Sequence, residues 1–338
     1  MMDARLLTDA LRDPSSTAHM NSADWTSLIT MARAEQLIGT LAHRLDGLDL
    51  PDSVARLFAD TRRSADIGRR QALWEAEMAR RVLAPLNTPV VLLKGTAYVA
   101  AGLSPGVGRS IGDLDILVRR NALDRVEQAL IEQGGWEWVK DDDYDDAYYR
   151  DHMHELPPLI HNERDRMIDV HHTILPLTAR PTPDPQAMLD DAIALDNGLS
   201  ILSPPDMICH AAAHLFADGD LAGGLRNLWD IDRLLRDFAD QPGFWQALGE
   251  RADRHELGKP VARALRLAET VYGTPVDGDV AGRGRQGDAF YLRRLLARDG
   301  WGCETRKGLR LAVYIRSHWL RMPPLMLARH LWTKWRKS

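Results

Sequence analysis

Apolar residues recur every three to four positions at both ends of the chain, whereas the middle alternates short apolar runs with helical segments. The helical spacing covers residues 1–88, where a long helix is expected from about 54 to 83, and it resumes over residues 203–338. Residues 89–178 contain short aliphatic runs that are typical of buried strands. The proline-rich stretch 179–202 predicts a linker. The pattern therefore predicts an α/β core between an N-terminal and a C-terminal helical region.

Two aspartates open one of these runs, the segment 113–118. If this segment is a strand, Asp113 and Asp115 point to one face, whereas Leu114 and Ile116 point to the other. Two like charges held this close are unfavourable unless a cation lies between them. Carboxylates suit Mg²⁺, which proteins hold through one or two carboxylates plus substrate phosphates. An Asp-x-Asp pair is also common at solvated strand ends, so the pair alone leaves both interpretations open.

A glycine turn precedes the aspartate pair. The apolar run 90–93 indicates a strand, Lys94 and Gly95 interrupt it, and residues 97–101 favour a helix. A strand, a glycine and a helix start can bind phosphate, because the glycine permits close approach and the helix N-terminus offers unpaired N–H groups. Lys94 adds a positive charge at the strand end. An ordinary strand-to-helix turn has the same pattern, so this segment alone also leaves two interpretations.

A third aspartate lies inside the apolar run 166–174, which predicts another strand. Ile168 and Val170 flank Asp169, and an acid buried among apolar side chains needs a partner or a metal. His171 shares the face of Asp169 and is expected to contact substrate or to orient the carboxylate. Three acids from two neighbouring strands that face a glycine turn predict a two-metal phosphoryl-transfer site.

Taken together, these segments resemble the uncharacterised nucleotidyltransferase family of the DNA polymerase β-like superfamily. The resemblance covers about two thirds of the chain and rests on 92–95, on Arg109 with 112–118, on 168–171, and on the later segments 206–215 and 228–232. It implies an α/β (α+β) fold with a small mixed β-sheet of the polymerase β-like nucleotidyltransferase type. Residues 89–178 would form the catalytic core, flanked by N- and C-terminal helical regions.

The resemblance also implies a reaction, the transfer of a nucleoside monophosphate from an NTP such as ATP to an acceptor, with release of pyrophosphate. Asp113 and Asp115 would hold two Mg²⁺ or Mn²⁺ ions, and Asp169 would bind the catalytic metal and help to activate the acceptor. The sequence does not specify the acceptor, which is a small molecule, a peptide or a protein. The alternative is a catalytically silent module that retains this fold for binding or assembly, although the presence of all three acids argues against simple decay.

The same resemblance implies which residues contact the nucleotide, with catalysis resting on positioning and charge neutralisation. The cofactor-binding set consists of Lys94, Gly95, Thr96, Arg109 and Ser110. Gly95 and Thr96 would contact the β- and γ-phosphates. Lys94 and Arg109 would counter the phosphate charge.

Several histidines lie on or near the predicted strands of the core: His152, His154, His161, His171 and His172. A zinc site is one interpretation, but their spacing does not resemble a closed tetrahedral set with cysteines. The acidic stretch 140–146 precedes them. Because its acids follow no regular period, this stretch is expected to be a solvated loop.

Two further pairs of polar residues lie in predicted helices of the C-terminal region. His210 and His214 are one helical turn apart, but no glutamate follows the first histidine as in metallopeptidase helices. They are therefore expected to serve packing or to lie on the substrate side. Asp230 and Asp232 are expected to face either a cleft or solvent.

The composition of the 338 residues, 45% hydrophobic and 27% charged, is ordinary for a globular protein. No apolar run reaches the length needed to span a membrane, and the N-terminus lacks the long apolar core of a signal peptide. The two cysteines, Cys209 and Cys303, are too few for a disulfide scaffold. A cytoplasmic location is therefore expected.

Charge is distributed unevenly along the chain, which the net charge of −5 conceals. Residues 305–338 hold nine basic residues and no acid, so the rest has 34 basic against 48 acidic residues. Residues 322–338 are expected to form a helix docked on the acidic body, with an apolar face inward (Leu331, Trp332, Trp335) and two arginines outward (Arg329, Arg336). The basic face would be available to anionic surfaces, whereas the acidic body makes nucleic acid a less favoured partner.

Overall fold

The computed structural model describes residues 3–140, 143–217 and 219–323, together with Leu327 and Trp332. The chain begins with α1 (Arg5–Arg12), α2 (Ser22–Ala34), α3 (Ile38–Arg44) and α4 (Asp52–Leu83). The middle contains β1 (Val90–Leu92), α5 (Lys94–Ala100), β2 (Asp113–Val118), α6 (Leu123–Glu132), β3 (Trp136–Trp138), α7 (Asp143–His152), β4 (Leu159–His161), β5 (Met167–His171), α8 (Pro185–Asp190), β6 (Ile193–Ala194) and β7 (Ser200–Ile201). The remainder contains α9 (Pro204–Ala217), α10 (Gly224–Phe238), α11 (Phe244–Arg254), α12 (Gly258–Tyr272), α13 (Gly278–Ala281), α14 (Asp288–Leu295) and α15 (Lys307–Arg321).

Within the described residues, the strands form one mixed sheet of seven strands in the order β3-β4-β5-β2-β1-β7-β6. The central strand β2 pairs parallel with β5 and antiparallel with β1. Its side chains from Leu114 to Val118 are buried, which is expected of a strand covered on both faces. The expected α/β fold, a mixed sheet flanked by helical regions, is confirmed.

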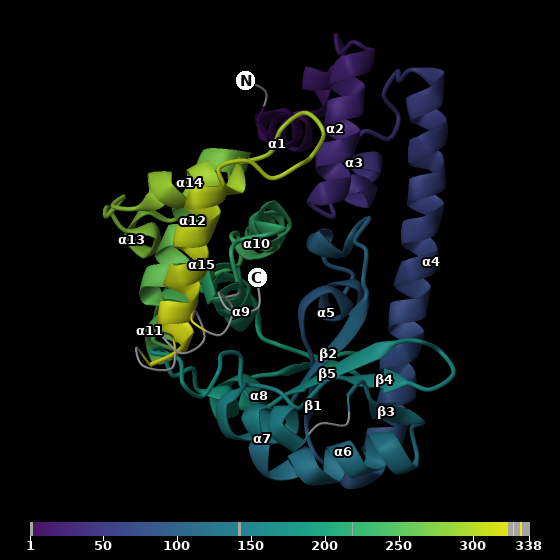
Figure 1. The fold of residues 1–338 in the computed structure, drawn as a ribbon, viewed down its shortest axis with the longest axis vertical. Helices are drawn as coiled ribbons and strands as arrows, with labels where there is room; N and C mark the ends of the chain where they lie inside the picture. The colour runs from purple at the N-terminus through teal and green to yellow at the C-terminus, as the bar shows by residue number, and fades with distance from the viewer. Residues whose placement is uncertain (1–2, 141–142, 218, 324–326, 328–331, 333–338) are drawn as a thin grey trace.

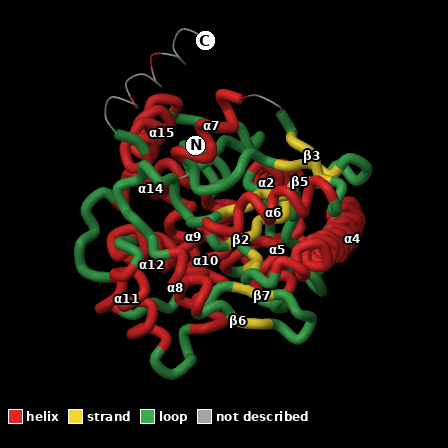
Figure 2. Tube along the Cα trace, turned by 90° about the horizontal axis from the view of Figure 1, so that it is seen from below, coloured by secondary structure: helices red, strands yellow, loops and turns green. Residues whose placement is uncertain are grey.

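Helices enclose this sheet on two sides. Figure 1 shows α4 as a long helix along one side of the molecule, while α11 to α15 gather on the other side. Seen from below in Figure 2, the strands lie between these two groups. Helix α4 contacts β1, β2, α5 and α6, and its start at Asp52 and end at Leu83 match the long helix predicted from the apolar spacing. The N-terminal helical region therefore supports the sheet directly.

Residues 179–202 are not the linker that their proline content predicts. They contain α8 and the β6–β7 hairpin, and Ile201 of β7 pairs with Leu92 of β1 in parallel. The side chains of Leu199, Ile201 and Leu202 are buried, so apolar contacts hold this segment on the sheet. The hairpin extends the sheet beyond the predicted boundary at residue 178.

The acidic stretch 140–146 is not entirely the solvated loop that was expected, since helix α7 begins at Asp143. Contacts from the other end of the helix supply a physical reason. Arg150 Nη2 donates to both carboxylate oxygens of Glu127 in α6, at 2.7 and 2.9 Å, and its guanidinium lies over the Trp138 ring. The helix is thus held by tertiary contacts that the local charge pattern does not reveal.

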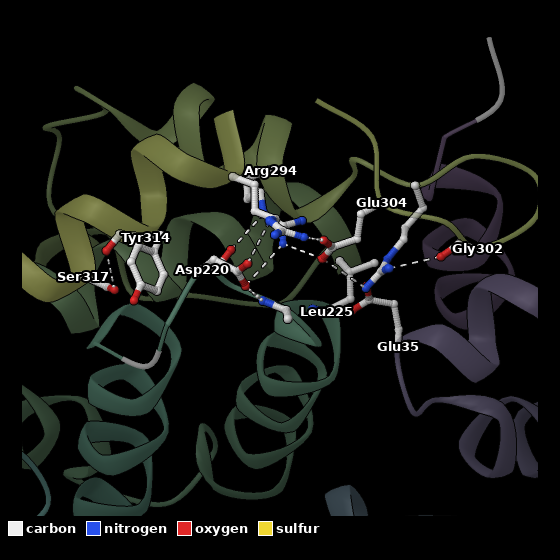
Figure 3. A network of polar contacts seen from close by, with 11 residues as sticks. Glu35, Asp220, Leu225, Arg294, Gly302, Glu304, Tyr314 and Ser317 are labelled. Atoms are coloured by element: carbon white, nitrogen blue, oxygen red, sulfur yellow. Dashed lines mark hydrogen bonds and ion pairs between the residues drawn. The ribbon is translucent and has the colours of Figure 1, made fainter. Parts of the chain in front are cut away.

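A buried polar network joins the N-terminal helices to the C-terminal helices (Figure 3). Arg298 Nε donates to Glu35 Oε1 at 2.7 Å, at the end of α2. In α14, Arg294 donates to Glu304 Oε1 at 2.7 Å and to the carbonyl oxygen of Asp220 at 2.8 Å. Burial raises the pKa of Glu35 even though the Arg298 guanidinium opposes the shift. The two helical regions therefore pack as parts of one structure around the sheet.

The predicted orientation of the C-terminal tail is wrong at Trp332, which is 59% exposed, whereas Leu327 is buried. Four other predicted positions of this tail lie outside the described residues: Leu331, Trp335, Arg329 and Arg336.

None of the helices that the structure describes combines the length and apolar character needed to cross a membrane.

Candidate active site

Three aspartates converge where β2 and β5 run side by side. Asp115 is paired with Asp169 across the parallel strands, and Asp113 is paired with Met167. The three side chains share one face of the sheet because residues two apart in a strand point the same way. Carboxylate oxygens of Asp113, Asp115 and Asp169, which we call the acid triad, lie within 4.8 Å of one another. The pairing register therefore brings together the three acids that the sequence pattern singled out.

Asp115 is the most enclosed of the three, with 2% of its surface exposed. Its Oδ1 accepts from Lys94 Nζ at 2.6 Å and lies 3.0 Å from His171 Nε2. Burial disfavours the charged carboxylate, but Lys94 and His171 outweigh that effect and hold the pKa of Asp115 well below its usual range. Burial also disfavours the ammonium, but Asp115 raises the pKa of Lys94 to about 12. Asp115 is therefore a fixed negative charge.

Among the described residues, no lysine, arginine or histidine forms an ion pair or hydrogen bond with the other two acids. Burial, with the adjacent Asp115 carboxylate, raises the pKa of Asp113. Burial, Asp115 and Glu155 raise the pKa of Asp169 to about 7. The cause in both cases is negative charge concentrated in a poorly solvated site. A divalent cation would neutralise that charge, so the donor set fits the metal that the sequence predicts.

Gly95 and Thr96 lie in the first turn of α5, which begins at Lys94, three residues before the predicted helix. Both are buried. A Cβ at Gly95 would lie 2.5 Å from Arg109 Nε, so the space that the missing side chain leaves is used by Arg109. Lys94 has φ +48°, in the left-handed region that non-glycine residues rarely adopt, just where the strand turns into the helix. Gly95 has no side chain, so any ligand contact there would involve its main-chain groups.

Arg109 is tied to the C-terminal region through an ion pair with Asp230 of α10. Arg226 Nε lies 3.2 Å from the other oxygen of Asp230, and the Arg109 guanidinium lies over the Tyr98 ring. Asp230 and Asp232 are both buried, so neither faces solvent. Arg109 is therefore positioned by a helix more than 100 residues away in the chain.

Ser110 is exposed and, with Arg109, lines a cavity of about 450 Å³. Arg33 and Arg166 also line it, and its described lining residues include no acid. Arg166 precedes Met167, the partner of Asp113 across the sheet. This basic cavity therefore lies next to the start of the two strands that carry the acid triad.

A second cavity, of about 190 Å³, is lined by Lys94, Asp169, His154, Glu155 and His214, among others. His171 lies on the face of the triad as predicted, but its hydrogen-bond partner is Asp115 on the neighbouring strand, not Asp169. The sequence pattern did not single out Glu155. Its proximity to the strands depends on main-chain pairing with His171, for which no local signal exists.

Comparison with known proteins identifies the family of the chain. A family model described as uncharacterised nucleotidyltransferase matches residues 21–273, which include the whole sheet and the acid triad. The chain belongs to the uncharacterised nucleotidyltransferase family. The resemblance seen in the sequence is thereby confirmed, and membership places the chain among transferase enzymes.

The chain is also similar to a solved structure, that of an antigenic nucleotidyltransferase-like protein from Paracoccidioides brasiliensis. The two are 14% identical, with a TM-score of 0.31, over 57% of this chain and 92% of the other. No protein with a curated description matches the chain.

Proposed function

We propose that the protein transfers a nucleoside monophosphate from an NTP, with ATP as one candidate, to an acceptor and releases pyrophosphate. The observation that carries the proposal is the convergence of three carboxylates within 4.8 Å on adjacent strands of a nucleotidyltransferase-family chain. Phosphoryl transfer depends mainly on positioning and on neutralising phosphate charge, and such a cluster of acids is suited to hold the ions that do this.

Asp113, Asp115 and Asp169 would hold Mg²⁺ or Mn²⁺, which would polarise the phosphate and favour the deprotonated acceptor. Lys94 and His171 both contact Oδ1 of Asp115, which leaves its second oxygen for a cation. Asp169 would bind the catalytic ion and, through it, help to activate the acceptor group. His171 keeps the Asp115 carboxylate in a fixed orientation.

The triphosphate would lie between Lys94 and the basic cavity that Arg109 and Ser110 line. Arg33 and Arg166 add positive charge there, which suits an anionic ligand next to Asp113. We propose that Gly95 and Thr96 contribute main-chain N–H groups, since both residues lie in the first turn of α5.

The acceptor would be a small molecule, a peptide or a protein, and we propose that the reaction takes place in the cytoplasm. Nucleic acid is a less favoured acceptor because the body outside residues 305–338 has an excess of acids. Helix α15 carries Arg310, Arg316 and Arg321 and leaves Leu311 and Trp319 exposed. This basic and partly apolar helix is the part that we propose for peripheral contact with anionic surfaces.

Labelled nucleotides test the proposal. The purified chain is incubated with Mg²⁺ or Mn²⁺, cell extract as a source of acceptors, and each NTP labelled at either the α- or the γ-phosphorus. Transfer of the α-label with release of labelled pyrophosphate from the γ-labelled NTP is the expected result. Transfer of the γ-label would contradict it and indicate a kinase. NTP binding without transfer of either label would favour the binding or assembly module.

A further inference from the structure

A second cluster of metal-ligand side chains lies beside the acid triad. Ligand atoms of His154, Glu155 and His171 lie within 4.8 Å of one another. We propose that these three residues bind one divalent ion of the zinc class, at a site separate from the acid triad. The inference does not depend on the proposed nucleotidyl transfer, because it requires no nucleotide.

Main-chain hydrogen bonds fix the two parts of this cluster against each other. Leu156 N donates to the carbonyl oxygen of Val170, and His172 N donates to that of His154, both at 2.9 Å. Glu155 and His171 form an antiparallel bridge between these two bonds. The segment therefore runs beside the end of β5 as a short extra strand. Ligands carried by paired strands are held more rigidly than ligands on a free loop, as a metal site requires.

The buried ring of His171 makes the contact that points to a cation. Its Nε2 lies 3.0 Å from Asp115 Oδ1, while its Nδ1 lies 3.3 Å from Glu155 Oε2 without forming a hydrogen bond. If Nε2 carries the proton donated to Asp115, the lone pair of Nδ1 faces the Glu155 carboxylate. Two electron-rich atoms at that distance repel each other unless a proton or a metal ion lies between them.

Asp115 provides the hydrogen-bond acceptor that the second ring nitrogen of a metal-bound histidine usually has. Such a histidine commonly donates its second ring N–H to a carboxylate, which fixes the tautomer and makes the ligand nitrogen more basic. His171 has this arrangement, with Nε2 toward Asp115 and Nδ1 toward the cluster. A proton on Nδ1 is the competing explanation, and it predicts no metal binding.

The spacing of the ligand atoms agrees with a tetrahedral ion. Glu155 Oε2 lies 3.3 Å from His171 Nδ1 and 3.5 Å from His154 Nε2. Ligands at about 2.0–2.1 Å from a tetrahedral zinc ion lie about 3.3–3.4 Å apart. Two imidazoles and one carboxylate suit zinc and its neighbours, whereas Mg²⁺ prefers oxygen ligands alone. The cluster therefore differs in metal preference from the acid triad.

The cluster also has an entry path. His154 and Glu155 line the cavity of about 190 Å³ that Asp169 and His214 share. Three protein ligands with an open fourth position are typical of zinc sites that accept water or substrate. An ion held here would face the same cavity as Asp169 of the acid triad.

Cobalt titration tests the site without any assay of activity. Full-length protein carrying Asp113→Asn, which weakens metal binding at the acid triad, is freed of metal and titrated with Co²⁺. We expect one equivalent to bind with visible absorption typical of imidazole-bound cobalt, and Zn²⁺ to abolish that absorption. His154→Ala or Glu155→Gln should weaken Co²⁺ binding by more than about 100-fold, because loss of even a hydrogen-bond partner of a ligand costs about 10–100-fold.

The matched control is His19→Ala, which removes an exposed histidine and should leave Co²⁺ binding unchanged. Circular dichroism and thermal unfolding check that each variant folds, and His154→Gln replaces any variant that does not. Absence of cobalt absorption in the parent protein would overturn the proposal, and so would undiminished binding in His154→Gln and Glu155→Gln. Failure of nucleotidyl transfer in the labelled-NTP assay would leave this result unaffected.

Discussion

Lys94 Nζ lies 2.6 Å from Asp115 Oδ1, so an ammonium group neutralises the most deeply buried acid of the triad. In a two-metal site, that charge would have to share Asp115 with a divalent cation. The Lys94–Asp115 ion pair thus stabilises the metal-free protein and competes with a metal ion for Asp115. It also makes Asp115 a poor first choice for mutagenesis, because Asp115→Asn would leave Lys94 without its buried partner.

Replacing Lys94 by methionine should lower the free energy of unfolding of the metal-free protein by about 1–3 kcal/mol, since Asp115 would lose its counter-charge. Mn²⁺ should then raise the melting temperature of Lys94→Met by more than it raises that of the wild type, because repulsion between the ammonium and the metal is gone. Differential scanning fluorimetry with and without Mn²⁺ measures both effects. The control is Lys307→Met, an exposed lysine in α15. An equal Mn²⁺ effect in Lys94→Met and wild type would contradict the expected competition.

Asp113→Asn should reduce nucleotidyl transfer by at least about 100-fold while leaving the melting temperature nearly unchanged, since metal contacts contribute several kcal/mol to the transition state. Asp113 is the most exposed member of the triad, which makes its replacement structurally mild. Asp124→Asn is the matched control, because the Asp124 side chain is 97% exposed on α6. Transfer of the α-labelled nucleotide at a rate within a few-fold of wild type would remove Asp113 from the catalytic machinery.

Metal affinity should depend on pH through Asp169, whose pKa is raised to about 7 by burial and by the neighbouring Asp115. A metal ligand must be the carboxylate, so below pH 7 the ion competes with a proton. Mn²⁺ affinity should therefore fall about tenfold for each pH unit below 7 and level off above it. Calorimetric titration across this range measures the slope. Asp169→Asn should bind Mn²⁺ more weakly and without that slope, and persistence of the slope in the variant would assign it to another group.

Gly95→Ala should destabilise the protein by about 1–3 kcal/mol, because the new Cβ would lie 2.5 Å from Arg109 Nε. Displacing Arg109 would disturb its ion pair with Asp230 and reduce the rise in melting temperature that NTP with Mg²⁺ produces. Gly112→Ala is the matched control, since a Cβ there meets no atom within 4 Å. Thermal unfolding with and without NTP compares the two variants. Equal melting temperatures and equal NTP effects would show that Arg109 can move aside without loss of stability or of nucleotide binding.

Patterns within single segments were enough to predict the strand 113–118 and the strand around Asp169 from alternation, and the helices on either side from an apolar spacing of three to four residues. Alternation also placed Asp113 with Asp115, and Asp169 with His171, because side-chain direction within a strand depends on local geometry alone. The contact between Asp115 and His171 across the two strands was not predictable in the same way. It depends on the register of β2 against β5, which the packing of the whole sheet selects.

Several other features depend on contacts between segments that are far apart in the sequence. Composition predicts a linker at 179–202, but pairing of Ile201 with Leu92 makes part of it a sheet strand. The glycine at position 95 signals close approach, and the tertiary structure brings the Arg109 side chain to it. Sequence periodicity indicates which face of an element is buried, whereas the group that packs against that face comes from a segment far away in the sequence. For this protein the sequence by itself determined the two strands that carry the acid triad and the acids on them, and the tertiary structure decided how those acids are paired, neutralised and exposed.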